Sequence, residues 1–67
     1  MHLYRFHFLD TAGAVTRRHS MKLPSDAAAI KLGQRMFAED DSDCGLEIWQ
    51  LNRLVHQENR PTLSAAG

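Results

Sequence analysis

Apolar and polar residues alternate most clearly over residues 3–9, Leu-Tyr-Arg-Phe-His-Phe-Leu. A period of two residues is typical of a strand that has one buried face. We expect one face of this strand to lie against the core and to carry Tyr4, Phe6 and Phe8. The opposite face, which carries Arg5 and His7, should point away from the core.

A helical period is present over residues 25–41. Pro24 disfavours helix at the residue before it, and Ser25 can accept hydrogen bonds from the N–H groups of the first turn. We expect the helix to end near residue 39 or 40, because an acidic C-terminus opposes the helix dipole. The apolar arc covers about half of the helical wheel, and it contains Ala28, Ala29, Ile30, Leu32, Gly33, Met36 and Phe37. Glycine at position 33 lowers helix stability by about 1 kcal/mol relative to alanine. A close approach of the helix to a strand would offset this loss.

The segment between the first strand and the helix predicts the second half of a hairpin. Residues 10–13, Asp-Thr-Ala-Gly, have the composition of a turn, and residues 14–23 would be the returning strand. If the apolar residues of that strand face the core, strict alternation also turns Arg17 and His19 inward. Either a bulge near residues 18–20 or an edge strand that bends away would resolve this conflict, and both alternatives remain open.

A second hairpin is predicted after the helix. Residues 44–50 should form a strand with Leu46 and Ile48 on one face, and with Glu47 and Trp49 on the other. A tight turn follows, in which we expect Asn52 to adopt the left-handed conformation. Residues 54–57 should form a short fourth strand.

The predicted order of elements is therefore ββαββ. We expect one α+β domain over residues 1–58, in which a single helix covers one face of a small antiparallel sheet. Residues 59–67 are small and polar and lack a period, so we expect a disordered tail. The strand order stays open at this point.

Composition limits the classes of function. The chain has 67 residues, zero net charge and one cysteine, so an intramolecular disulfide and a thiolate metal cluster are both excluded. The lone thiol and the lack of a leader-like segment favour a cytoplasmic protein with no membrane partner. The charges are segregated: residues 1–23 carry +3, residues 24–50 carry −4 and residues 51–67 carry +1. These parts could complement one another within one molecule or between two copies.

Three stretches together resemble a family of short bacterial proteins known only as a domain of unknown function. They are Tyr-Arg-Phe-His-Phe-Leu-Asp at 4–10 followed by Gly13, Leu-Pro-Ser-Asp-Ala-Ala-Ala at 23–29, and Glu-Ile-Trp-Gln at 47–50. The resemblance covers residues 3–57 and implies the ββαββ order and a bacterial cytosolic setting. It brings no activity and no catalytic residue. Residues 17–19, Arg-Arg-His, depart from the family, whose members are often acidic there.

The sequence contains no pattern that predicts catalysis, a cofactor or a metal site. The four histidines lack helical i, i+4 spacing, although His7 and His19 could meet across the first hairpin. Cys44 lies among aspartates, which disfavour its thiolate. We expect residues 40–43 to be a solvated acidic loop, because they lack the glycine and the distal glutamate of a calcium-binding loop. We therefore expect a protein that is not an enzyme, and we identify no small-molecule substrate.

One helix can cover only one face of the sheet, so the other face is our candidate site. We expect an interaction surface on a non-catalytic module that self-associates, as a homodimer, through Arg5, His7, Trp49, Leu51 and Arg53. The alternative is a nucleic-acid-binding face, because cations beside an aromatic ring suit stacked bases and phosphates. That alternative would use Arg5, Arg17, Arg18, Lys22 and Arg53.

Overall fold

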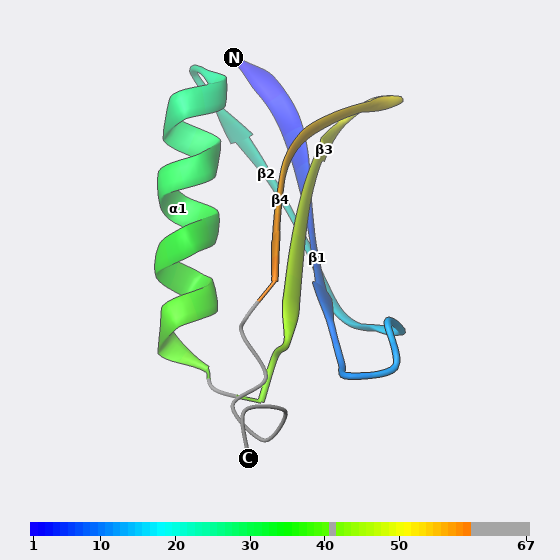
Figure 1. The fold of residues 1–67 in the computed structure, drawn as a ribbon. Helices are drawn as coiled ribbons and strands as arrows, with labels where there is room; N and C mark the ends of the chain where they lie inside the picture. Colours follow the sequence, from blue (N-terminus) through cyan, green and yellow to red (C-terminus); the bar gives the residue numbers. More distant parts are fainter. Residues whose placement is uncertain (41, 60–67) are drawn as a thin grey trace.

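The computed structural model describes residues 1–40 and 42–59 of the chain. Its elements follow in the order β1 (His2–Leu9), β2 (Val15–Leu23), α1 (Asp26–Glu39), β3 (Gly45–Gln50) and β4 (Arg53–Asn59). The ββαββ order is thus confirmed (Figure 1). β4 is longer than residues 54–57, and Cys44 lies just outside β3. Asn59 ends β4, and the rest of the predicted tail, residues 60–67, lies outside the described residues.

The four strands form one antiparallel sheet in the order β2-β1-β3-β4. The two hairpins are joined through the central pair of β1 and β3, so β2 and β4 are the edges. Helix α1 lies along one face of this sheet (Figure 1). The β1–β2 turn and the β3–β4 turn lie at opposite ends of the sheet, and both bend away from the helix. They therefore frame the uncovered face, which we call the open face.

The core lies between α1 and the two central strands. Its buried side chains are Tyr4, Phe6 and Phe8 of β1, Leu46 and Ile48 of β3, and Ala29 and Phe37 of the helix. Ile30, Leu32 and Met36 pack against this cluster from the helix. The aromatic face of the first strand therefore meets the helix, as predicted. Burying each of the large apolar side chains contributes about 1.5–3 kcal/mol.

Helix α1 begins and ends where the sequence predicts. The N-cap is Ser25, whose side chain accepts a hydrogen bond from the backbone N–H of Ala28 at 3.2 Å, and the C-cap is Asp40. Gly33 is buried and faces the sheet. A Cβ atom at position 33 would lie 2.7 Å from Cδ1 of Ile48 and 3.2 Å from Cδ2 of Phe6. The helix therefore approaches the sheet so closely that a Cβ atom at position 33 would force the Ile48 side chain to move, and the predicted packing role of Gly33 is confirmed.

Strand β2 keeps the phase that turns Arg17 and His19 to the helix side, and its position at the sheet edge accommodates them. Phe8 pairs with Arg17 but Leu9 pairs with Val15, so Thr16 is the extra residue. Of the two alternatives left open, the bulge near residues 18–20 is wrong, because the register shifts closer to the turn. Beyond the bulge, Arg17, His19, Met21 and Leu23 all point to the helix side. His19 and Met21 stay exposed there because β2 is an edge strand.

The two turns use different residues to reverse the chain. In the β1–β2 turn the Asp10 side chain accepts from the N–H groups of Ala12 and Ala14, and Gly13 has a φ of 84°. In the β3–β4 turn Leu51 has a φ of 54°, and it is the one non-glycine residue with a positive φ among those described. The expectation that Asn52 would be left-handed was therefore wrong. A first central residue of positive φ suits a two-residue hairpin, although glycine is the usual occupant.

Candidate interaction surface

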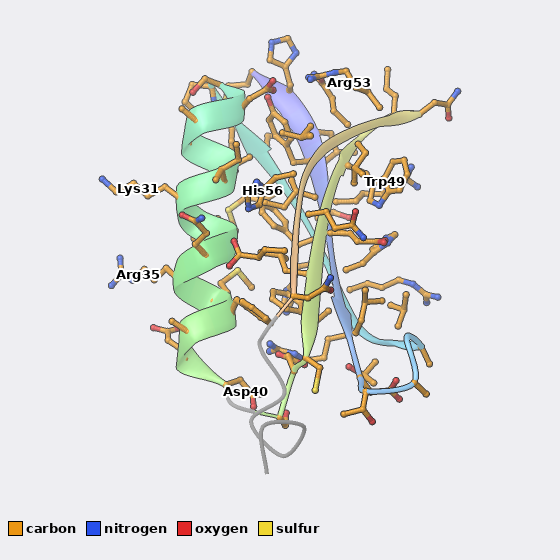
Figure 2. The ribbon with its side chains drawn as sticks, viewed as in Figure 1. Lys31, Arg35, Asp40, Trp49, Arg53 and His56 are labelled. Carbon is orange, nitrogen blue, oxygen red and sulfur yellow. The ribbon has the colours of Figure 1, made fainter. Side chains whose placement is uncertain are left out.

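The register of the central strands determines which side chains share the open face. Because Phe6 and Phe8 point to the helix, their neighbours Arg5 and His7 point to the other side. Arg5 pairs with Trp49, and His7 pairs with Glu47. The open face therefore unites three predicted residues, Arg5, His7 and Trp49, and Figure 2 shows Trp49 on the side of the sheet opposite the helix.

Apolar side chains on this face extend beyond the predicted set. Leu54 pairs with Trp49 and is 41% exposed, while Leu3 is 50% exposed on β1. Trp49 itself is half-buried, and its indole N–H donates to Oε1 of Glu47 at 3.2 Å. Sequence reasoning missed Leu54 because β4 contains a bulge, the second one in the sheet. Val55 is the extra residue, since Ile48 pairs with His56 and Trp49 with Leu54.

A hollow of about 390 Å³ lies at the end of the open face that is next to the β3–β4 turn. It is lined by Leu3, Arg5, Leu51 and Asn52. The Arg5 guanidinium donates from Nη2 to the backbone carbonyl of Leu51 at 3.1 Å, which links β1 to the turn. The Leu51 side chain is 79% exposed. The structure therefore places Leu51 beside Arg5, as the predicted surface requires, but at its rim.

Arg53 does not belong to the open face. It pairs with Gln50 on the helix side and donates two hydrogen bonds of 3.0 Å to the carboxylate of Asp26, in the first turn of α1. Asp26 also accepts a hydrogen bond of 2.7 Å from the Tyr4 hydroxyl. The bonds from Arg53 and Tyr4 hold the pKa of Asp26 below 3.8. The bond to Asp26, with burial, raises the pKa of Tyr4 above 10.0.

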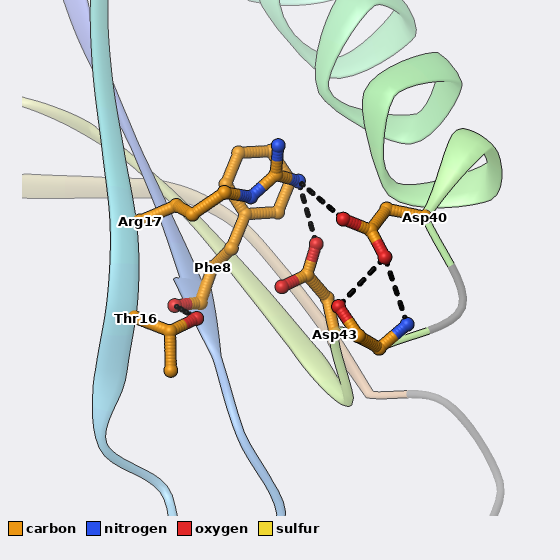
Figure 3. Close-up of polar contacts among 6 residues, drawn as sticks. Phe8, Thr16, Arg17, Asp40 and Asp43 are labelled. Atoms are coloured by element: carbon orange, nitrogen blue, oxygen red, sulfur yellow. Dashed lines mark hydrogen bonds and ion pairs between the residues drawn. The ribbon is translucent and has the colours of Figure 1, made fainter.

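Arg17 is also held on the helix side of the sheet. Its guanidinium carbon lies 4.4 Å from the centre of the Phe8 ring, and Nη2 is 2.6 Å from Oδ2 of Asp43 (Figure 3). Asp43 is 2% exposed, so the expectation of a solvated loop was wrong at this residue. Asp40, 4.0 Å from Arg17, accepts from the backbone N–H and the hydroxyl of Ser42. Arg17 and Arg53 thus leave the predicted nucleic-acid set, of which Arg5, Arg18 and Lys22 point to the open face.

The histidines are separated by the fold. His7 pairs with Arg18 on the open side, whereas His19 pairs with Phe6 on the helix side, so the proposed meeting of His7 and His19 does not occur. On β4, His56 lies 2.8 Å from Glu58, which also accepts from Gln34 of the helix at 3.1 Å. Among residues 1–40 and 42–59, no group of three histidine, cysteine or acidic side chains could hold a metal ion.

No protein-family model, curated protein or solved structure matches this chain. The resemblance to a bacterial family therefore stays a prediction. Within the described part of the chain, the helix is too short and too polar to cross a membrane.

Proposed function

We propose that this chain is a small non-catalytic module that binds another protein with the open face of its sheet. The observation that carries the proposal is the cluster of Leu3, Trp49 and Leu54 on a face that the helix does not cover. A tryptophan contributes about 150–250 Å² of contact area when it is buried. Tryptophan and arginine are also the residues most enriched at the energetic centres of interfaces. Trp49 and Arg5 are adjacent here.

The proposal includes the setting in which the module acts. A single thiol, Cys44, supports a reducing compartment, and the resemblance supports a bacterial cytosol. The test of this part is the redox state of Cys44 in cells that are lysed in the presence of an alkylating agent. A reduced thiol should react with the agent, and a Cys44 that is already oxidised and does not react would contradict the proposed compartment.

Site-specific photo-cross-linking tests the proposed surface. A photoreactive residue at Ser20, which pairs with Arg5 at the edge of the open face, should give discrete protein adducts in cells that produce the chain. The same residue at Lys31, exposed on the helix, is the matched control and should give none. Excess unlabelled protein should compete the adduct away, whereas a Trp49→Ser variant should not. Equal adducts from both positions would contradict the proposal.

Nucleic acid is the second candidate, because Arg5, Arg18 and Lys22 share the open face with one carboxylate, Glu47. Trp49 fluorescence during titration with a single-stranded oligonucleotide would report such binding. Three phosphate contacts predict a slope of log affinity against log salt of about −2. Unchanged fluorescence at low salt would remove this candidate.

A further inference from the structure

The two central strands carry different chemistry on the open face. β1 presents Arg5 and His7, and β3 presents Trp49 and Glu47 at the same two heights, because Arg5 pairs with Trp49 and His7 with Glu47. One strand therefore offers a cation and an imidazole. Its neighbour offers an aromatic ring and a carboxylate, which are the complementary groups.

This pattern is self-complementary about one particular axis. Consider a two-fold axis that lies between two facing copies, runs parallel to the strands and passes over the midline between β1 and β3. This axis places β1 of one copy over β3 of the second copy. Arg5 then faces the partner's Trp49, and His7 faces the partner's Glu47, each contact occurring twice. An axis across the strands would instead place Arg5 against the partner's His7. We infer that the partner proposed above is a second copy of this chain, packed face to face about the axis between β1 and β3.

The rim of the open face supports the same arrangement. The axis carries the β3–β4 turn of one copy over the β2 side of the other, next to the partner's Leu3. Leu51, at 79% exposure, and Leu3, at 50%, would thereby cover each other. The bend of the turn toward the open side allows this overlap (Figure 1). Arg18 and Lys22 lie near the β2 edge, where solvent screens their charge.

The size of the face is sufficient for such a dimer. Four strands spaced about 4.8 Å apart, each contributing about six residues at 3.3 Å, give a projected area of about 400 Å². The relief of the side chains brings this close to the roughly 600–800 Å² per partner of a small specific interface. Aligned sheets cross at about 30°, so residues match best near the axis, where these four side chains lie.

Two charge variants test the inference because His7→Glu should repel a second copy of itself, Glu47→Lys should lose the contact with the partner's His7, and the two variants should attract each other. His7→Glu places carboxylates at both facing positions, and Glu47→Lys removes the carboxylate that His7 faces. Each variant alone should raise the dimer Kd at least tenfold by sedimentation equilibrium. An equimolar mixture should recover a heterodimer, identified by its mass in native mass spectrometry. Lys31→Glu on the helix is the control and should leave the Kd unchanged.

The outcomes separate this inference from the proposed function on which it rests. A wild-type chain that is monomeric at several hundred micromolar, yet still gives cross-links from Ser20 to another protein, overturns the second copy alone. Loss of those cross-links overturns both. Two dissociated variants that fail to recombine overturn the arrangement of β1 over β3. If either variant fails to fold by circular dichroism, His7→Gln and Glu47→Gln replace them. The double variant should then lose no more affinity than either single one, and additive losses overturn the contact.

Discussion

Replacing Gly33 with alanine sets two known effects against each other. Alanine favours the helix by about 1 kcal/mol over glycine. Its Cβ would lie 2.7 Å from Cδ1 of Ile48, 3.2 Å from Cδ2 of Phe6 and 3.3 Å from Cδ2 of Leu46. Phe6, Leu46 and Ile48 are completely buried, so none can move into solvent.

The packing term should exceed the helical one. Overpacking a core by one methyl group costs about 1–3 kcal/mol, so Gly33→Ala should lower the free energy of unfolding by about 1 kcal/mol. For a domain of this size, that corresponds to a fall in Tm of about 4–8 °C. The loss should shrink when Ile48→Val removes the Cδ1 atom that stands closest. That substitution alone costs about 0.5–1.5 kcal/mol.

A double-mutant cycle measured by urea unfolding decides the question. We expect Gly33→Ala with Ile48→Val to lose about 1 kcal/mol less than the sum of the single losses. Independent sites add to within about 0.3–0.5 kcal/mol. Lys31→Gly against Lys31→Ala measures the helical term at an exposed position of the same helix. A stabilised Gly33→Ala variant, or strict additivity, would refute the close approach.

Three further substitutions test the turn and the two ion pairs. Leu51→Gly should stabilise the monomer by about 1 kcal/mol in urea unfolding, because glycine adopts a φ of 54° without strain; an unchanged midpoint would contradict the strain. Arg17→Met should lower the free energy of unfolding by about 1–3 kcal/mol, since the buried Asp43 loses its cation. Arg18→Met on the open face is the control and should lower it by less. Equal losses would show that burial of the ion pair has no effect on stability. Because the pKa of Asp26 is lowered in the folded state, the ionised carboxylate stabilises the fold. This stabilisation is fully present above pH 3.8 and is lost as the pH falls through the folded pKa. The gap in Tm between wild type and Asp26→Asn should therefore be constant near neutrality and narrow below pH 3.8, and a gap that ignores pH would argue against the charged form.

The core could be predicted from the sequence because its signals are local. The alternation of Tyr4, Phe6 and Phe8 reports one buried face, and the arc through Ala29, Gly33 and Phe37 reports the helical surface that covers it. Each periodicity follows from the geometry of its own element. Three of the five predicted surface residues, Arg5, His7 and Trp49, followed in the same way, since the residues between buried positions must point to the opposite side.

The partners of Arg17 and Arg53 could not be predicted because they depend on contacts between distant segments. Arg17 meets Asp43 across 26 positions of sequence, and Arg53 meets Asp26 across 27. A one-residue bulge decides the phase of each edge strand, at Thr16 in β2 and at Val55 in β4. Sequence alternation contains no signal for such an insertion, and the assignment of every later side chain to a face depends on it.

The sequence by itself therefore determined the order ββαββ, the buried face of each central strand, the cap at Ser25 and the packing role of Gly33, because these depend on neighbours within a few residues. Only the tertiary structure decided the strand order, the positions of the bulges and which cations remain on the open face. The strand order and the partners of the cations depend on segments more than twenty residues apart, whereas each bulge depends on the pairing register within its own hairpin. In the β3–β4 turn, strand pairing likewise outweighs local preference, because it holds Leu51 at a positive φ.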